Sequence, residues 1–473
     1  MKKIARLLAL AMAVLMIFSL AACSGGGSTT NNDSETPNTD PNAPSEWVFD
    51  MGGKAIKVAC WWKPMPTENA STEKARYQYI QMQEAMKKYN FTVEEIVVDQ
   101  REIKPSFEAA QMAGDVWADV TYMRAEQAEK LAKAGSLLPL QDLYPMDSVE
   151  YNQNIRDRFT INGNTYAFTY YMDNFENCIA FNKDVFDQAG VEYPYTLVDQ
   201  GKWTWDKFIE TIQKTTIKDA TTGKTQVYGY YASTGLGQAE KFMYTCIGRE
   251  LIEIDPATGK YVSNAKDPEV LAFMDRVRSL NTMKDYVYLP PSNVTEWQDA
   301  PEKFKSGRIA MYNWSMSGGP NALKEMEADW GVVPIPVEKE GQAYKLMNTT
   351  QNVHVMPAAL SKDMDWAKKV AYVYHLIHKD PYTDEERDAK FREEIESQLR
   401  DEKSVDIVLK FTNNPEIPVT LHNSTMIGND SHWSTIDIPA IKALSGEDTV
   451  ARAFASFADA HAALVADANG EAK

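Results

Sequence analysis

The chain has 473 residues, of which 44% are hydrophobic, so it is long enough for two domains and apolar enough for a sizeable core. Its formal net charge of −18 becomes −21 without the first 22 residues, which hold three basic side chains and no acidic one. This acidic balance argues against nucleic acid and against an anionic membrane face as partners.

The N-terminus has the pattern of a secretory signal. Lys2, Lys3 and Arg6 precede an uncharged apolar run over residues 7–22. That run is short for a membrane-spanning helix, which needs about 20 residues, and it fits the central part of a signal peptide. Small residues followed directly by Cys23 resemble the bacterial lipobox, at which this cysteine would be lipid-modified and become the first mature residue. An ordinary signal peptide that happens to place a cysteine there is the alternative.

The stretch from residue 24 to residue 46 consists mainly of Gly, Ser, Thr, Asn, Asp and Pro. With almost no apolar side chains, it cannot offset the entropy of ordering, so we predict a disordered tether. A flexible chain of this length reaches roughly 25 Å on average. Beyond it, Cys60, Cys178 and Cys246 form no CxxC pair, which favours buried thiols with at most one disulfide.

Strand and helix patterns then alternate three times. The expected strands cover residues 55–61, 91–98 and 118–122, and the expected helices cover 72–89, 105–113 and 124–134. This alternation predicts a parallel sheet with helices on both faces. Ligands bind beyond the carboxyl ends of such strands. Here those ends carry Trp61, Trp62, Tyr122 and Arg124.

The rest of the chain carries clear turn and cap signals. Asn162-Gly163 predicts a hairpin turn, Gly190 ends a helix over 183–189, and Thr204 caps a helix that runs to residue 214. Further strands are expected at 227–233, 309–312, 330–336 and 353–356, and further helices at 267–280, 363–379, 384–410, 437–442 and 450–468. The highly charged helix over 384–410 is interpreted as a solvated face.

Six segments resemble, in the same order, motifs of the extracellular solute-binding proteins of ABC importers, in the sugar-binding class known as family 1. They are Gly114–Val120, Ala134–Leu140, Phe181–Val191, Thr204–Phe208, Phe304–Met311 and Gly331–Pro336. Each motif alone is weak, but six in order behind a lipobox are strong. The resemblance runs from Cys23 to about Lys379. It departs at Ala118, where proline is common, and at the charged segment 380–406, which resembles an insertion.

The resemblance implies a two-lobed α/β fold of the periplasmic-binding-protein type II, with the ligand in a cleft that closes by a hinge motion. The implied chain crossings lie near 169–173 and 337–345. The resulting domain prediction is a signal peptide at 1–22, a lipidated Cys23 and tether at 23–46, lobe 1 at 47–170 plus 343–382, and lobe 2 at 173–340 plus 383–473.

A sugar presents flat apolar faces and rims of hydroxyl groups, so its site needs aromatic planes and a few polar side chains for paired hydrogen bonds. Such residues occur at the expected strand ends, at the first chain crossing, after the strand at 309–312 and in a late loop. The candidate ligand-binding residues are Trp61, Trp62, Tyr122, Arg124, Tyr171, Asp173, Asn174, Ser233, Trp314 and Trp433. Trp203 and Trp205 are expected to pack a helix instead.

The sequence offers little support for an enzyme. It lacks a phosphate-binding loop, an HExxH pair and a GxSxG elbow, and we predict no cofactor and no metal. The resemblance implies a monomeric lipoprotein on the outer face of the cell membrane, which binds a carbohydrate, in particular an oligosaccharide, and delivers it to an ABC permease. The lipobox with its long polar tether favours a Gram-positive cell, where no outer membrane would retain a soluble binder. The alternatives are a binder of a polyol, glycerophosphodiester or peptide, or a surface glycan-degrading lipoprotein.

Overall fold

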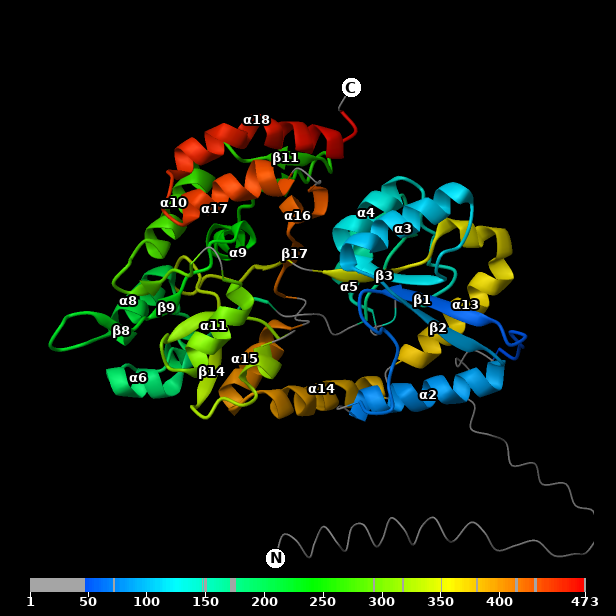
Figure 1. Ribbon diagram of the computed structural model, residues 1–473, viewed down its shortest axis with the longest axis horizontal. Coiled ribbons are helices and arrows are strands. Elements are labelled where there is room, and N and C mark those ends of the chain that lie inside the picture. Colours follow the sequence, from blue (N-terminus) through cyan, green and yellow to red (C-terminus); the bar gives the residue numbers. More distant parts are fainter. Residues whose placement is uncertain are drawn as a thin grey trace, which may run out of the picture. The chain divides into compact units, whose positions relative to one another are not determined.

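The computed structural model describes residues 47–473 except 71–72, 147, 149–150, 171–175, 292–293, 317–318, 350, 380–381, 413–415, 429–431 and 472–473. Two separate sheets organise the part from Asp50 onward (Figure 1). We call the first sheet with its packed helices lobe 1 and the second sheet with its packed elements lobe 2.

Lobe 1 is built on a four-stranded sheet with the strand order β16-β3-β1-β2. β1 (Ala55–Cys60) pairs in parallel with β2 (Thr92–Val97) and with β3 (Val120–Arg124). This confirms the parallel arrangement predicted from the alternating pattern. The edge strand β16 (Asn352–Val355) runs antiparallel to β3 and joins the sheet from a distant part of the chain.

The helices of lobe 1 are α2 (Glu73–Tyr89), α3 (Gln100–Ala113), α4 (Ala125–Lys133) and α13 (Met364–His378). α3 begins at Gln100 rather than at residue 105, because Asp99 caps it by accepting a hydrogen bond from the backbone of Arg101 at 2.9 Å. Pro105 therefore lies inside the helix. Gly135 follows α4 with a φ of 69°, a left-handed conformation that glycine adopts readily after a helix end.

A short helix and the predicted hairpin follow α4. α5 (Gln153–Arg158) leads into β4 (Thr160–Ile161) and β5 (Asn164–Thr165), which pair antiparallel. Asn162 and Gly163 both have positive φ values, 52° and 80°, as the tight turn requires.

Lobe 2 is built on the sheet β13-β6-β14. Its central strand β6 (Cys178–Asn182) is buried throughout and runs antiparallel to β13 (Met311–Trp314) and to β14 (Trp330–Pro334). α6 (Lys183–Ala189) and α8 (Trp205–Thr215) follow the predicted bounds closely, and Trp203 and Trp205 are both buried.

The elements outside the two main sheets include one long helix that was not predicted from the sequence, α9 (Leu236–Ile247). The remaining helices are α7 (Tyr195–Asp199), α10 (Pro268–Asn281), α11 (Glu296–Lys305), α12 (Gly319–Leu323), α16 (Asn423–Ile427), α17 (Ile438–Leu444) and α18 (Val450–Ala468). The remaining strands are β7 (Ile217–Lys218), β8 (Thr225–Val227), β9 (Tyr230–Tyr231), β10 (Ile252–Ile254), β11 (Tyr261–Ser263), β12 (Val287–Tyr288), β15 (Leu346–Asn348) and β17 (Val419–Leu421). Two short irregular helices are η2 (Ala358–Asp363) and η3 (Trp433–Asp437).

Two elements that were predicted to be continuous are interrupted in the structure. The helix expected over 384–410 is divided into α14 (Asp384–Gln398) and α15 (Glu402–Phe411), because Leu399 is extended and Asp401 caps the second helix. α15 also packs on β14 through a buried apolar face, so it is not a solvated helix. The strand expected over 227–233 is interrupted at Gly229, where a Cβ atom would lie only 2.0 Å from the carbonyl oxygen of Ile212.

A buried ionic network links the two lobes. Glu129 of α4 accepts hydrogen bonds from Tyr261 of β11 at 2.6 Å and from Arg158 at 2.9 Å, and Arg158 also donates to the hydroxyl of Tyr261 at 2.7 Å. Lys133 contacts the same carboxylate at 2.8 Å. α4 also packs against α16, which contacts α18 of lobe 2. The network therefore joins α4 of lobe 1 to β11 of lobe 2.

The three cysteines beyond residue 46 are all free and buried. Over the ranges that the structure describes, no helix has both the length and the apolar character needed to cross a membrane.

Candidate ligand pocket

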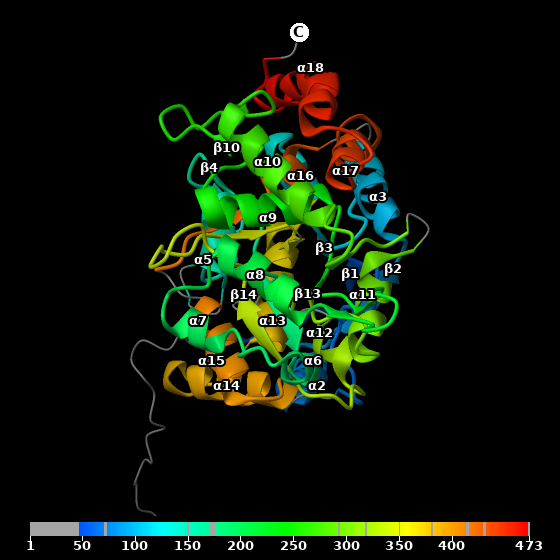
Figure 2. The same cartoon turned by 90° about the vertical axis from the view of Figure 1, so that its left-hand side faces the viewer.

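Lobe 2 contains a pocket of about 860 Å³, which lies within the size range of small-molecule sites. Its walls come from α11, α12, the end of β13 and the segment that follows β9. α11 contacts both α12 and β13, and the three elements lie together in Figure 2. Two of the residues predicted from the sequence, Ser233 and Trp314, line this pocket.

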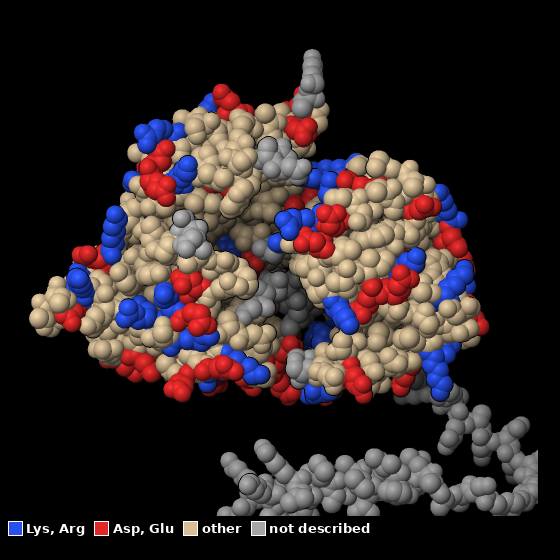
Figure 3. Space-filling view, viewed as in Figure 1, with Lys and Arg blue, Asp and Glu red and all other residues tan. Residues whose placement is uncertain are grey.

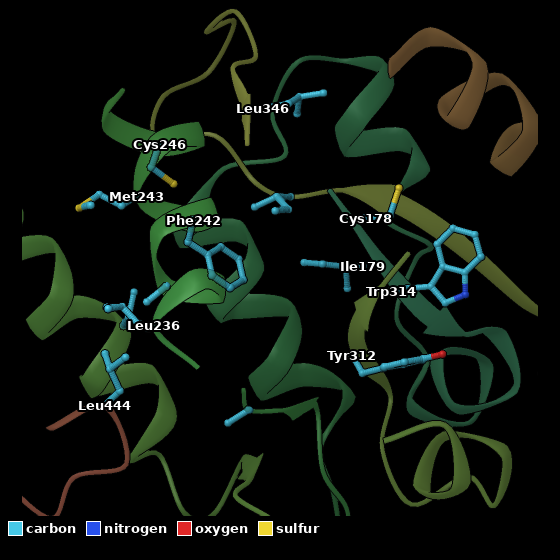
Figure 4. Packing of buried hydrophobic residues seen from close by; sticks show 14 of the residues in the cluster. Cys178, Ile179, Leu236, Phe242, Met243, Cys246, Tyr312, Trp314, Leu346 and Leu444 are labelled. Atoms are coloured by element: carbon cyan, nitrogen blue, oxygen red, sulfur yellow. The ribbon is translucent and has the colours of Figure 1, made fainter. Parts of the chain in front are cut away.

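The floor of the pocket is aromatic. Tyr312 and Trp314 lie two positions apart on β13, so their rings project to the same side of the strand (Figure 4). Both are buried, and the indole of Trp314 packs against that of Trp330 with 5.9 Å between ring centroids. The hydroxyl of Tyr312 and the Nε1 atom of Trp314 have no hydrogen-bond partner among the described residues. Buried polar atoms of this kind are normally satisfied by water or by a ligand.

The position of Trp314 depends on a neighbouring glycine. Gly319 begins α12 so close to the indole that a Cβ atom there would lie 2.0 Å from Nε1 of Trp314. The indole can therefore pack directly against the start of α12 only because residue 319 has no side chain.

One wall of the pocket is held in place by carboxylates of α11. Glu296 accepts hydrogen bonds from Ser233 Oγ at 2.8 Å and from both the backbone nitrogen and the hydroxyl of Thr234 at 3.2 Å. Asp299 accepts a hydrogen bond from Tyr231 at 3.1 Å. Ser233 is thus placed at the pocket by its bond to Glu296, and its hydroxyl oxygen can still accept a hydrogen bond.

The pocket carries no free positive charge among its described lining residues. Lys305 is its single basic residue, and its ammonium lies 2.5 Å from the carboxylate of Glu302, which also lines the pocket. On the face shown in Figure 3, Lys and Arg side chains lie among Asp and Glu rather than in a basic patch. The pocket therefore suits a neutral ligand better than an anionic one.

A second aromatic group lies in lobe 1, at the carboxyl ends of β1 and β3. The ring centroids of Trp61 and Tyr122 are 5.9 Å apart in a stacked arrangement, and Trp62 meets both rings edge-on at 4.6 and 5.0 Å. Trp62 is 42% exposed. The structure thus brings together three of the residues predicted from the sequence, and one of them presents an indole to solvent.

This aromatic group rests on a neutral histidine. The ring of His354, on the neighbouring strand β16, lies 4.5 Å from Tyr122, and its Nδ1 atom meets the hydroxyl of Tyr374 at 3.0 Å. Burial lowers the pKa of His354 well below its usual value, so the imidazole stays uncharged near neutral pH.

The other predicted ligand-binding residues are placed apart from these two groups or were not described. Arg124 follows Tyr122 by two positions on β3 and lies against the side-chain amide of Gln100. With the amide oxygen of Gln100 turned toward Arg124, this oxygen accepts hydrogen bonds from the guanidinium at 2.5 and 3.3 Å. Trp433 is 61% exposed at the start of η3. Tyr171, Asp173 and Asn174 lie outside the described residues.

Sequence reasoning missed several residues of the pocket. Tyr231, Glu296, Trp297 and Tyr312 all line it. Tyr312 lies two positions before Trp314 in the same strand, so the two-residue repeat of a strand could have identified it. The others come from α11 and the segment after β9, whose meeting depends on tertiary structure.

Lobe 2 also contains a buried polar cluster. Nε2 of His422 contacts the carboxylate of Glu240, which also accepts a hydrogen bond from the backbone of Leu251 at 2.9 Å. Asn423 donates to Glu250 at 2.9 Å. Among the described residues, no group of three or more His, Cys, Asp or Glu side chains is arranged to hold a metal ion.

Glu250, a member of this cluster, makes the free energy of unfolding of the protein depend on pH. Burial, followed by the charge of Glu240, raises the pKa of Glu250 from 4.5 to about 8. The folded protein thus binds one more proton than the unfolded chain between these values, and the free energy of unfolding falls as pH rises from about 4.5 to 8. We expect Glu250→Gln, which stays neutral, to raise the melting temperature at pH 8 and to leave it nearly unchanged at pH 4.5.

Thermal denaturation of both proteins across this range provides the measurement. Each pKa unit corresponds to about 1.4 kcal/mol, so the gain at pH 8 should reach several kcal/mol. An equal effect of the substitution at both pH values would contradict a titrating Glu250.

Two α/β lobes, each built on its own sheet, have the architecture of the type II solute-binding fold. The chain belongs to the bacterial extracellular solute-binding protein family, which matches residues 69–370. No curated protein shows a significant match to the chain.

Solved structures share the fold at low sequence identity. UgpB from Mycobacterium tuberculosis, in complex with glycerophosphocholine, is 15% identical, with a TM-score of 0.61 over 87% of this chain and 99% of its own. Lmo0181 from Listeria monocytogenes, with cycloalternan, is 17% identical, with a TM-score of 0.58 over 88% and 99%. The cyclic α-maltosyl-1,6-maltose binding protein of Arthrobacter globiformis is 14% identical, with a TM-score of 0.60 over 88% and 100%.

Proposed function

We propose that the protein binds a carbohydrate, in particular an oligosaccharide, and delivers it to an ABC transporter permease. The observation that carries this proposal is the composition of the lobe 2 pocket. Its floor holds the rings of Tyr312 and Trp314, each with an unpartnered polar atom among the described residues. Aromatic planes match the apolar faces of sugar rings, and the hydroxyl of Ser233, which also lines the pocket, matches their hydroxyl groups.

The charges of the pocket favour a carbohydrate over a phosphodiester. A phosphodiester would need an unpaired cation, whereas Lys305 is already neutralised by Glu302, and Glu296 adds a further negative charge. The structural relatives supply both kinds of ligand, since cycloalternan and glycerophosphocholine each occupy one of them. For this chain we therefore keep the glycerophosphodiester as the ligand to be excluded.

The proposal includes the location and mode of action. We infer that residues 1–22 are a signal peptide, that Cys23 carries the lipid, and that residues 24–46 tether the lobes to the outer face of a Gram-positive membrane. We also propose that lobe 1 comprises 47–170 plus 343–382, and lobe 2 comprises 173–340 plus 383–473. Closure of the lobes around the ligand, with no bond broken, completes the mechanism.

A thermal-shift panel tests the ligand class. The panel holds linear maltooligosaccharides, xylooligosaccharides and galactooligosaccharides of one to six units, cyclic glucans, glycerophosphocholine and short peptides. At 100 times the Kd, a ligand stabilises the folded state by about 2.7 kcal/mol, which for a chain of this size corresponds to a rise of roughly 3 °C in Tm. We expect such a rise with at least one oligosaccharide and none with glycerophosphocholine.

A rise with glycerophosphocholine or a peptide, and none with any saccharide, would overturn the substrate class. Chromatography of the stabilising saccharide after prolonged incubation tests the binding mechanism separately. We expect the saccharide to be recovered intact, and the appearance of shorter products would favour a glycan-degrading enzyme instead.

A further inference from the structure

Trp297 differs from the other aromatic residues of the pocket in its exposure. It is 75% exposed, whereas Tyr231, Tyr312 and Trp314 are 2%, 5% and 3% exposed. All four line the same pocket. The buried rings thus form the floor, and the indole of Trp297 stands at the rim, where it meets solvent.

The helix that carries Trp297 shows why this exposure is unusual. Trp297, Pro301 and Phe304 follow one another at spacings of four and three, so they share one face of α11. Phe304 is fully buried in the core, and Pro301 is buried while it also lines the pocket. The apolar face of α11 therefore passes from the core along the pocket wall and ends in an exposed indole at its mouth.

Neighbouring contacts hold the rim residue in place. Glu296 is bonded to Ser233 and Thr234, and Asp299 accepts from Tyr231, so the turn of α11 that bears Trp297 is fixed on both sides. The indole is thus presented on a rigid support, which lowers the entropy lost when a ligand stacks on it.

We propose that Trp297 sets the preference of the pocket for ligand length by stacking on the sugar units that extend beyond the floor. This inference rests on the proposed carbohydrate function. A short saccharide fills the floor against Tyr312 and Trp314 and does not reach the rim. A longer chain places a further ring on the exposed indole, which covers apolar surface that water otherwise contacts.

The test compares affinities along the linear oligosaccharide series that stabilises the wild-type protein in the thermal-shift panel. Isothermal titration calorimetry would measure wild-type protein, Trp297→Ala and Trp297→Tyr with each length from one to six units. We expect Trp297→Ala to leave the shortest bound saccharide unaffected and to weaken the longer ones by about 5- to 10-fold, the range of a single aromatic contact. Trp297→Tyr, which keeps an aromatic plane, should restore most of that loss.

The matched control is Met112→Ala, which removes an apolar side chain that is 84% exposed on α3, outside the pocket. It should change no affinity at any length. A loss in Trp297→Ala that is equal at all lengths, or no loss at all, would overturn the role of Trp297 while leaving the carbohydrate function intact. Failure of the wild-type protein to bind any saccharide of the panel would instead overturn the proposed function, and this inference with it.

Discussion

Trp314→Ala is expected to weaken binding of the saccharide that stabilises the wild-type protein by about 100-fold or more. An effect of this size is typical of a central aromatic anchor. The indole forms the floor of the pocket together with Tyr312, and its Nε1 atom is a buried donor without a partner among the described residues. Removing it takes away both a stacking plane and a hydrogen-bond donor. Isothermal titration calorimetry with the saccharide identified by thermal shift measures the loss.

The same substitution also affects stability, so a control must separate the two effects. Trp314 is buried against Trp330, and truncating a buried tryptophan costs about 3–5 kcal/mol. Trp203→Ala is the matched control, because Trp203 is equally buried and donates its Nε1 hydrogen to the carbonyl of Pro334 at 2.8 Å, outside the pocket. Well below both melting temperatures, Trp203→Ala should retain affinity. Equal losses in the two variants would remove Trp314 from the site.

Gly319→Ala reaches the same indole without removing it. The new methyl group would lie 2.0 Å from Nε1 of Trp314, so the ring must shift, and affinity should fall in the same direction. Gly235→Ala provides the comparison, because a Cβ atom there would meet Ser233 Oγ at an ordinary 3.6 Å. Unchanged affinity in Gly319→Ala would show that the position of the indole is unimportant for binding.

Elements whose ends depend on nearby residues could be predicted from the sequence. Thr204 caps α8 by accepting a hydrogen bond from Lys207, and Gly190 ends α6 with a φ of 66°. The parallel pairing of β1, β2 and β3 followed from the alternation of strands and helices. In each case the physical cause lies within a few residues of its effect, or in a simple rule of connection.

Elements set by distant contacts could not be predicted in the same way. The register of β16 on β3, in which Val353 faces Met123, joins segments far apart in the chain. α9 was missed because it is buried on several sides and includes the buried side chains of Glu240 and Lys241, which hide a helical apolar stripe. Lys241 is satisfied there by an ion pair with Glu176 at 2.9 Å, a partner that local sequence does not reveal.

The candidate site shows the same division. Aromatic residues at strand ends indicated Trp61, Trp62 and Tyr122, and the structure places their rings in contact. Trp297 escaped notice because its spacing to Phe304 predicts burial, and only the meeting of α11 with the pocket explains its exposure. Whether these residues contact a ligand stays a prediction that the binding experiments address.

Glu129→Ala is expected to destabilise the folded protein by about 3 kcal/mol, because it leaves the largely buried guanidinium of Arg158 without its counter-charge. Tyr261 of lobe 2 would also lose its carboxylate acceptor. Urea denaturation of the wild-type protein and the variant measures the difference. The control is Glu108→Ala, which breaks the partly exposed Lys104–Glu108 pair on α3 and should cost under about 1 kcal/mol.

The dependence of this difference on pH identifies its electrostatic origin. Burial raises the pKa of Glu129, but Arg158 and Lys133 outweigh it, so the net pKa lies below the ordinary value of 4.5. A carboxylate with a lowered pKa stabilises the folded state fully above its unfolded value and loses that contribution as pH falls through the folded one. The gap between wild type and Glu129→Ala should therefore be constant near neutral pH and shrink below pH 4.5. A gap that stays the same in acid would mean that Glu129 acts through packing alone, and that no ionic network joins α4 to β11.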